Sequence, residues 1–431
     1  MQKQHGVNSR AISQIAFTVI FSVALALVSG GAICARAADD SVSSAPTPLL
    51  EKGHPVDWWF VFKFNAHAFP GCSEGDTRAC AFGGDVRPYA IGQQFVYASS
   101  EASRLKKGVG CLGDTETDPV GATFDEIYNG SFYYVIWNDQ FYDDPQITGC
   151  GKSCASPWGH SKGMLVWNNA GDGLVMQVTT PSWPAAGSSL FPRQSDGNTL
   201  GCVKDDNVKV SQHFFALKLT KSDLLKVLEA MRDASVVTDP RNPQIVHNGG
   251  PTDVQVLVRK LGTKSHSTSV LEAELSDGVR LIAKPSRLHV PPWQLVSAEL
   301  GGVALRTATW WAYPRISSTT GSTSIKCWRS DLPKAGAVEV ATSGSWQGQT
   351  FGLKGGPGPN FNHAKIGVTI SGVDPLAIFG DLNQQGALSG KNCGSSQNGR
   401  GGLFYVIRDK VLADSLAHLI DGETAPVSGA Q

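Results

Sequence analysis

The chain has 431 residues, of which 41% are hydrophobic, 9% are aromatic and 17% are charged, a composition that excludes an intrinsically disordered protein. Its length suits two domains or one large composite, and 48 Gly with 23 Pro predict a loop-rich α/β fold. The formal net charge is zero, which argues against a protein that coats DNA through a general basic excess.

Residues 1–37 have the layout of a secretory signal peptide. A polar start with Lys3 and Arg10 is followed by an apolar run over 16–28, and small residues precede the cleavage that we expect after Ala37. The apolar run is too short to predict a membrane span, so we expect no membrane anchor. Cleavage removes three of the 37 cationic residues, leaving 34 against 37 acidic ones, a net charge of −3. The protein is therefore expected to be secreted or periplasmic, or lysosomal in a eukaryote.

Two apolar runs predict buried strands, and one segment predicts a helix. The strands are expected at 54–63 and 131–137, where apolar and aromatic residues follow one another with little polar alternation. Thr220 is placed to cap a helix that runs to Met231. Asp223 stands where a capping box has an acidic residue.

The strongest linker signal after the signal peptide lies at 238–252, which contains Asp-Pro, Asn-Pro and Gly-Gly-Pro. It predicts two structural halves. The expected organisation is a signal peptide at 1–37, a flexible lead-in at 38–53, a first half at 54–237, a second half at 253–420 and a tail at 421–431.

Eight cysteines follow the expected signal peptide, an even number that is typical of disulfides in an exported chain. Zinc is the alternative, but the chain has no Cys-x-x-Cys pair. Cys327 and Cys393 are the only two in the second half, so this is the pair that we favour. The eight are Cys72, Cys80, Cys111, Cys150, Cys154, Cys202, Cys327 and Cys393.

One short element occurs twice, once in each predicted half. A His-x-Lys sequence stands at 160–162 and again at 363–365, and each precedes an apolar strand, a tight turn and a second strand. Because side chains at i and i+2 of a strand point to one side, each His faces the same way as its Lys. A pseudo-two-fold packing of the halves would bring both pairs to one cleft.

Two imidazoles and two ammonium groups in one cleft suit the chemistry of a phosphodiester. Lys162 and Lys365 would offset the charge of the phosphoryl oxygens. One histidine, His160 or His363, would attack phosphorus and the other would protonate the leaving oxygen. This scheme needs no metal ion and no other cofactor. The alternative is that both His-x-Lys sequences arose by chance at solvated strand ends.

These residues and their surroundings resemble the deoxyribonuclease II family, a branch of the phospholipase D superfamily. Five blocks in the family's order carry the resemblance, which covers most of residues 54–407. The blocks are 54–58 (His-Pro-Val-Asp-Trp), 137–140 (Trp-Asn-Asp-Gln), 158–163 (Trp-Gly-His-Ser-Lys-Gly), 361–365 (Phe-Asn-His-Ala-Lys) and 380–383 (Gly-Asp-Leu-Asn).

The resemblance implies an α/β fold in which a phospholipase D-like αβαβα sandwich is duplicated as two pseudo-symmetric halves, with the active site between them. It implies a metal-independent DNA endonuclease that leaves 3′-phosphate and 5′-hydroxyl ends through a phosphohistidine. His160 and His363 take the nucleophile and general-acid roles, with His160 favoured as the nucleophile. Lys162 and Lys365 bind the phosphate, and Asn383 donates a hydrogen bond to it.

Two positions depart from the family pattern. The family often has Asn where Ser182 stands in Pro-Ser-Trp-Pro, and a serine can still donate to a phosphoryl oxygen with a shorter reach. Ser182 therefore stays a candidate for phosphate binding. Gln384 stands where an Arg is usual, which is expected to weaken DNA binding.

Two other functions would use the same residues. A phospholipase D-like lipid phosphodiesterase would keep the two His-x-Lys pairs and present an apolar cleft mouth. A secreted non-catalytic binding or toxin protein would have lost a site residue, whereas both pairs and Asn383 are present. The leading expectation is a secreted endonuclease whose partner is its DNA substrate, and the sequence leaves a homodimer open.

Overall fold

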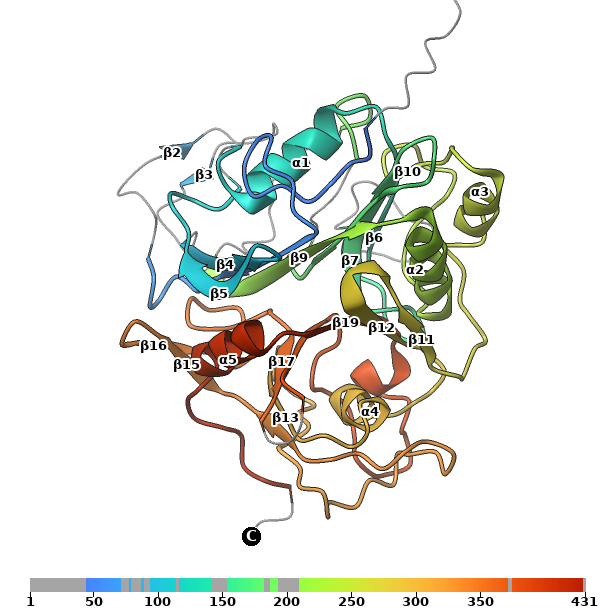
Figure 1. Cartoon of the computed structure of the whole chain (residues 1–431). Helices are drawn as coiled ribbons and strands as arrows, with labels where there is room; N and C mark the ends of the chain where they lie inside the picture. The colour runs from blue at the N-terminus through green and yellow to red at the C-terminus, as the bar shows by residue number, and fades with distance from the viewer. Residues whose placement is uncertain are drawn as a thin grey trace, which may run out of the picture. The chain divides into compact units, whose positions relative to one another are not determined.

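Figure 1 shows the computed structural model of the chain. It describes residues 44–70, 94–113, 116–141, 153–181, 187–192, 209–370 and 374–428, and the backbone of two short strands, β2 (Thr77–Arg78) and β3 (Arg87–Pro88). These residues form two large β-sheets with helices packed on them, the mixed α/β fold expected from the composition. No helix among them is long and apolar enough to cross a membrane.

The first sheet has eight strands, and all neighbouring strands in it are antiparallel. Both predicted strands belong to it, beginning at Trp58 and Tyr133. All six residues of the strand from Trp58 are buried, as expected for a strand covered on both faces. In spatial order the strands are β10 (Val246–His247), β6 (Tyr133–Asn138), β7 (Lys162–Trp167), β8 (Gly173–Val178), β9 (Gln212–Leu219), β1 (Trp58–Lys63), β4 (Phe95–Ser99) and β5 (Ala102–Lys107).

The second sheet has seven strands and is antiparallel except where β13 pairs with β14. In spatial order its strands are β11 (Leu271–Glu274), β12 (Val279–Lys284), β19 (Gly402–Arg408), β18 (Leu376–Gly380), β17 (Ile366–Thr369), β13 (Leu305–Ala308) and β14 (Val338–Val340). A separate hairpin of β15 (Ser343–Trp346) and β16 (Gln349–Gly352) contacts the C-terminal helix through β15.

Five α-helices of the described residues pack on these sheets. They are α1 (Pro119–Asn129), α2 (Lys221–Asp233), α3 (Thr252–Val258), α4 (Pro292–Glu299) and α5 (Lys410–Leu419). The capping box predicted for α2 is present: the Thr220 hydroxyl accepts from the Asp223 N–H, and the Asp223 carboxylate accepts from the Thr220 N–H. Both α2 and α5 contact strands of the two sheets and so bridge them.

The two sheets share one strand order. In the first sheet β1 pairs with β9, and β8, β7 and β6 follow in turn; in the second β12 pairs with β19, and β18, β17 and β13 follow. The two His-x-Lys sequences end at equivalent points, the start of β7 and the residue before β17. An α-helix follows each of the equivalent strands β9 and β19.

Aromatic side chains pack where the sheets face each other. Phe60 of β1 stacks on Phe379 of β18 with the ring centroids 4.4 Å apart, and Phe215 of β9 lies 4.8 Å from the same ring. Tyr405 of β19 packs 5.4 Å from Phe215. Burial of each such side chain stabilises the fold by about 1.5–3 kcal/mol. One hydrophobic core therefore runs across the junction of the sheets.

Segments at the edges of the predicted halves also take part in the packing. Leu49, in the predicted lead-in, is buried, and its N–H donates to the Thr123 hydroxyl of α1. Strand β10 lies inside the predicted linker at 238–252 and pairs with β6. Ala425, in the predicted tail, is buried and donates its N–H to the Val340 carbonyl. These contacts join the lead-in to α1 and the other two segments to the sheets.

Cys327 and Cys393 form the disulfide favoured from the sequence. It joins the loop between β13 and β14 to the loop between β18 and β19. Cys111 and Cys154 are also disulfide-bonded. The other four expected cysteines, Cys72, Cys80, Cys150 and Cys202, lie outside the described residues.

Replacing both Cys327 and Cys393 by Ala is expected to lower the free energy of unfolding by up to about 4 kcal/mol. The bond joins residues 66 positions apart, and closing a loop of that length reduces the conformational entropy of the unfolded chain. Urea unfolding followed by Trp fluorescence measures the change against the wild type. A loss below about 1 kcal/mol would contradict a stabilising role for this loop closure.

Candidate active site

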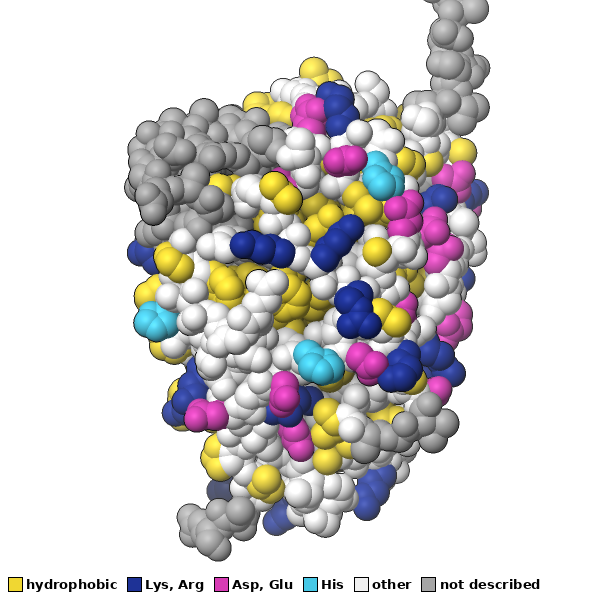
Figure 2. All heavy atoms as spheres, turned by 60° about the vertical axis from the view of Figure 1, so that its left-hand side comes forward, with side chains coloured by type: hydrophobic (Ala, Val, Ile, Leu, Met, Phe, Trp, Pro, Cys, Tyr) yellow, Lys and Arg dark blue, Asp and Glu magenta, His cyan; other side chains and the backbone are white. Residues whose placement is uncertain are grey.

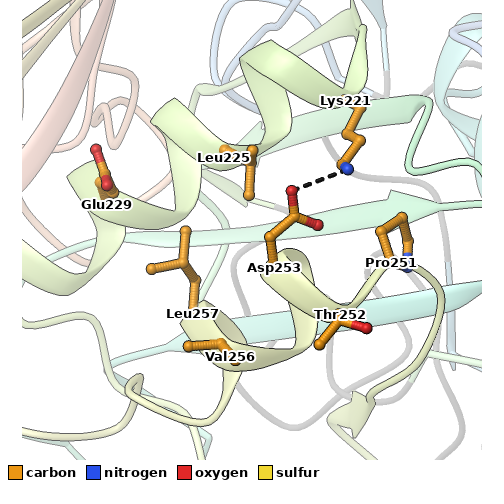
Figure 3. Close-up of a pocket in the computed structure, with 8 residues that line it drawn as sticks. All are labelled: Lys221, Leu225, Glu229, Pro251, Thr252, Asp253, Val256 and Leu257. Carbon is orange, nitrogen blue, oxygen red and sulfur yellow. Dashed lines mark ion pairs between the residues drawn. The ribbon is translucent and has the colours of Figure 1, made fainter.

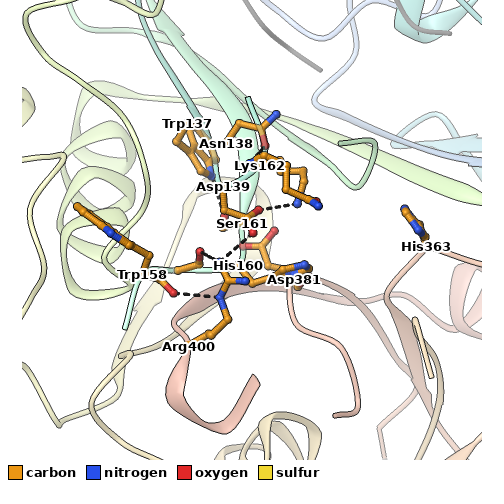
Figure 4. Close-up of polar contacts among 12 residues, drawn as sticks. Trp137, Asn138, Asp139, Trp158, His160, Ser161, Lys162, His363, Asp381 and Arg400 are labelled. Atoms are coloured by element: carbon orange, nitrogen blue, oxygen red, sulfur yellow. Dashed lines mark hydrogen bonds and ion pairs between the residues drawn. The ribbon is translucent and has the colours of Figure 1, made fainter. Parts of the chain in front are cut away.

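The first His-x-Lys sequence is fixed by contacts with the C-terminal half of the chain (Figure 4). The backbone N–H of His160 donates to the Gly401 carbonyl at 2.8 Å, and its ring Nδ1 lies 2.9 Å from the Asp381 carbonyl oxygen. Because a carbonyl oxygen only accepts, Nδ1 carries the hydrogen and Nε2 keeps its lone pair. His160 therefore has the tautomer that a nucleophile through Nε2 requires.

Lys162, the first residue of β7, belongs to a buried ionic cluster with Asp139 and Arg400. Its Nζ lies 2.6 Å from Asp139 Oδ1, and Arg400 Nη2 lies 2.8 Å from Asp139 Oδ2. Arg400 also donates to the Gly159 carbonyl at 2.6 Å, next to His160. Burial raises the pKa of Asp139, but the surrounding cations, Lys162 foremost, hold that pKa well below its ordinary value. One carboxylate thus compensates two cationic side chains.

The second His-x-Lys sequence is fixed by contacts with the N-terminal half. The His363 N–H donates to the Ser211 carbonyl at 2.7 Å, and Gln212 Nε2 donates to His363 Nδ1 at 3.4 Å. The Gln212 amide is oriented by the Thr179 hydroxyl, which donates to Oε1 at 2.7 Å. In its neutral form His363 therefore carries its hydrogen on Nε2, the opposite tautomer from His160.

The four side chains of the two His-x-Lys sequences lie close enough to influence one another's charge. Burial and the charges of Lys365 and Lys162 set the pKa of His363 well below its ordinary value. Burial also lowers the pKa of His160, together with Lys162 and against the effect of Asp139. Burial and Lys162 lower the pKa of Lys365 to about 7. Both lysines are buried, and both histidine residues are partly exposed.

Three buried residues connect the two His-x-Lys sequences. The Lys365 N–H donates to His213 Nδ1 at 3.0 Å, and His213 Nε2 lies 3.2 Å from Gln177 Oε1. Gln177 Nε2 donates to Asp381 Oδ1 at 3.0 Å, and the Asp381 carbonyl faces His160. Burial raises the pKa of the Asp381 carboxyl to about 7. A continuous hydrogen-bonded chain therefore runs from one sequence to the other.

Several of these residues had no role in the sequence analysis. Asp139 and Asp381 lie inside blocks that carry the family resemblance, and that position was the available signal for them. Arg400 and Gln177 lie outside the blocks, and no local pattern marks them. No repeated motif in the sequence distinguishes His213 from other isolated histidines, yet its side chain is fully buried.

The other predicted site residues are placed as follows. Asn383 is buried, its amide donates to Gln385 Oε1 at 2.9 Å, and its Oδ1 has no hydrogen-bond partner among the described residues. Gln384, which stands where an Arg was expected, is fully buried and donates to Gln294 Oε1 at 3.1 Å. Ser182 lies outside the described residues. Phosphate binding by Asn383 and Ser182 stays a prediction.

A separate hollow lies between α2 and α3 (Figure 3). Its volume is about 740 Å³, and its apolar lining includes Leu225, Val256 and Leu257. Lys221 and Asp253 form an ion pair of 2.8 Å at its edge. None of the predicted site residues that the structure describes lines this hollow, so the junction of the two His-x-Lys sequences is the candidate active site.

Lys162, Lys365 and Arg400 bring cationic side chains to this junction. On the face shown in Figure 2, Lys and Arg side chains lie among acidic and uncharged ones. Among the described residues, no three His, Cys, Asp or Glu side chains are grouped so that they could hold a metal ion. A phosphate at the junction would meet ammonium and guanidinium groups.

Comparisons with known proteins point to one family. The family model described as Deoxyribonuclease II matches residues 47–424. Deoxyribonuclease-2-alpha of Sus scrofa is 28% identical over 160 residues, and the Bos taurus protein of the same name is 29% identical over 161. Each match covers 36% of this chain and 38% of the mammalian protein. Cell-death-related nuclease 7 of Caenorhabditis elegans is 23% identical over 371 residues, which cover 84% of this chain and 83% of that protein.

Replacing Asp139 by Asn is expected to lower the free energy of unfolding at neutral pH by about 3–5 kcal/mol, because Lys162 and Arg400 would stay buried without the compensating charge. The pKa of Asp139 is lower in the folded state than in the unfolded chain, so its contribution is complete above about pH 4 and is lost as the pH falls through the folded-state pKa. Urea unfolding at several pH values should give a constant difference from wild type above about pH 5 and a smaller one in stronger acid.

Asp57→Asn is the matched control. Asp57 pairs with Lys218 at 3.4 Å, and both side chains are 50% exposed, so the loss should stay below about 1 kcal/mol. Equal losses in the two variants would contradict a special role for the buried cluster.

Proposed function

The chain belongs to the deoxyribonuclease II family, and we propose that it is a DNA endonuclease that hydrolyses phosphodiesters in two steps through a phosphohistidine, without a metal ion. The observation that carries this proposal is that the backbone of each reactive histidine is held by the other half of the chain, and that the charges of Lys162 and Lys365 act on both rings. Membership of the family makes a nuclease the expected hydrolase and DNA the expected substrate.

We propose further that the two sheets are the halves of a duplicated phospholipase D-like αβαβα sandwich. The shared strand order of β1-β9-β8-β7-β6 and β12-β19-β18-β17-β13 supports this. So does the equivalent placing of the two His-x-Lys sequences at β7 and β17. Neither half alone holds both histidines, so the proposed chemistry requires the two together.

In the first step, Nε2 of His160 attacks phosphorus while the bond from phosphorus to the 5′-oxygen breaks. The tautomer of His160 supports this role, since its hydrogen faces the Asp381 carbonyl and its lone pair is on Nε2. His363 acts from its charged form, in which Nδ1 also carries a hydrogen and no longer accepts from Gln212 Nε2, and it passes the Nε2 proton to the leaving 5′-oxygen. Lys162 and Lys365 offset the growing charge on the phosphoryl oxygens.

In the second step, a water molecule attacks the phosphohistidine. His363, now neutral, takes a proton from the water, the nitrogen–phosphorus bond breaks, and a 3′-phosphate is released. The charge of His160 while it carries the phosphoryl group is stabilised by the hydrogen bond from Nδ1 to the Asp381 carbonyl. The enzyme returns to its starting state, in which His160 is neutral and His363 is charged.

The charges around the site favour activity in acid. One histidine must be neutral and the other charged, and the lowered pKa values of both move that state toward acid pH. Lys365, with a pKa of about 7, loses its positive charge as the pH rises above that value. Phosphate binding should therefore weaken in alkali.

We also propose that the protein is exported, with residues 1–37 removed as a signal peptide. The disulfide between Cys327 and Cys393 supports an oxidising compartment, as do the disulfide-bonded Cys111 and Cys154. A secreted, periplasmic or lysosomal location fits both the disulfides and the proposed preference of the activity for acid pH.

Nicking of supercoiled plasmid is the test of the proposed reaction. The protein should cut DNA in excess EDTA, with a rate that falls from acid to alkaline pH, because Lys and His side chains supply the charge and the proton. The fragments should accept label from polynucleotide kinase at the 5′ end without phosphatase treatment, because the 5′-oxygen is the leaving group.

Two histidine variants and one control complete this test. His160→Asn and His363→Asn should each abolish cutting, whereas His54→Asn, at an exposed ion pair with Glu101, should keep it. Activity that requires magnesium, or fragments that carry a 5′-phosphate, would contradict the reaction.

A further inference from the structure

Two buried lysines lie outside the His-x-Lys sequences and at equivalent places in the two sheets. Lys63 is the last residue of β1, and Lys284 is the last residue of β12. Both side chains are fully buried, and burial lowers the pKa of each amine to about 7. Each amine donates to the backbone of a loop that precedes the neighbouring strand, β9 or β19.

Lys63 binds the loop that places the second histidine. Its Nζ donates to the Val210 carbonyl at 2.6 Å. The next residue, Ser211, accepts the His363 N–H through its carbonyl, and Gln212 donates to the His363 ring. The charge of Lys63 also acts on His363 and contributes to its low pKa. A lysine of the first sheet thus fixes the backbone that orients the histidine before β17.

Lys284 makes the corresponding contacts toward the first histidine. Its Nζ donates to the Asn398 and Arg400 carbonyls, each at 2.8 Å. Gly401, the next residue, accepts the His160 N–H through its carbonyl. The Arg400 side chain reaches the carbonyl next to His160 and also Asp139. A lysine of the second sheet thus fixes the backbone that orients the histidine before β7.

A lysine is a costly residue to bury, because its amine loses hydration. An apolar side chain of similar length, such as Met, would fill the same volume without that cost. Only the amine can satisfy the carbonyls of Val210, Asn398 and Arg400, which would otherwise lose these hydrogen bonds. A buried lysine donates to loop carbonyls at both equivalent places, which indicates that the loops before β9 and β19 both need to be held in position.

We propose that Lys63 and Lys284 are crossed positioning residues, each of which fixes the loop that aligns the reactive histidine of the opposite half. Lys63 acts through His363, and Lys284 acts through His160. This inference rests on the proposed function, because it assigns each lysine to the step that its histidine performs.

The test compares two substrates that differ only in the leaving group. DNA releases an alkoxide that needs a proton, whereas thymidine 3′-(4-nitrophenyl phosphate) releases 4-nitrophenolate without one. The first-turnover release of 4-nitrophenolate therefore reports nucleophilic attack alone. Lys63→Met should lower the rate of DNA cleavage about 10²-fold but change the rate on the nitrophenyl ester little. His363→Asn should likewise affect DNA cleavage far more than ester cleavage. Lys284→Met should lose a similar factor on both substrates, as His160→Asn does.

The ratio of the two rates on one preparation does not depend on the folded fraction, so it separates positioning from loss of stability. Lys63→Gln and Lys284→Gln replace the Met variants if those fail to fold. Their amide nitrogens lie one bond closer to the backbone than the amine and cannot keep the same carbonyl contacts, so the same pattern is expected. Lys218→Met and Lys410→Met, at side chains that are 50% and 73% exposed, should leave both rates unchanged.

The histidine whose Asn variant keeps its rate on the nitrophenyl ester is the general acid. Whichever histidine that is, the Lys63 variant must show the same pattern of the two rates as His363→Asn, and the Lys284 variant the same pattern as His160→Asn. If the Lys63 and Lys284 variants lower both rates by one common factor, or lower neither, the inference is wrong. Failure of the proposed function gives a different result, because the wild type would then cleave neither substrate in EDTA.

Discussion

The burial of cationic side chains between two sheets is the constraint on which this site depends. Lys162 and Lys365 are each 3% exposed, and Lys63 and Lys284 are fully buried. Desolvation of an amine is costly unless opposite charge or hydrogen bonds compensate for it. The Asp139 carboxylate compensates the charge of Lys162, and the amines of Lys63 and Lys284 donate hydrogen bonds to backbone carbonyls. A bound phosphate would add the negative charge that the site lacks.

The crossed contacts make the two halves interdependent. His160 is oriented by Gly401 and Asp381, and His363 is oriented by residues just before and within β9. The chain through His213 and Gln177 links the same two places within the core. Groups held in this way would need little rearrangement if charge developed on a bound phosphoryl group, which is the physical basis of electrostatic catalysis. Either half alone would lack the partners that orient its own histidine.

Local patterns predicted the parts of the fold that depend on local physics. The apolar run that became β1, the capping box of α2 and the disulfide between Cys327 and Cys393 are present in the structure. The two His-x-Lys sequences were visible because each repeats a short pattern before a strand hairpin. Arg400 and Gln177 were not predicted, because their partners lie more than 200 positions away in the sequence. Contacts of that kind are set by how the sheets pack, which no local period reveals.

Identification of the covalent intermediate tests the central claim most directly. The wild-type protein would be mixed with an excess of short DNA, quenched within its first turnovers under conditions that preserve phosphoramidates, digested, and analysed by mass spectrometry. The account predicts a nucleotide attached through its 3′-phosphate to the peptide that contains His160. Attachment to His363 would reverse the two histidine roles, and a label on a residue outside both His-x-Lys sequences would contradict the account.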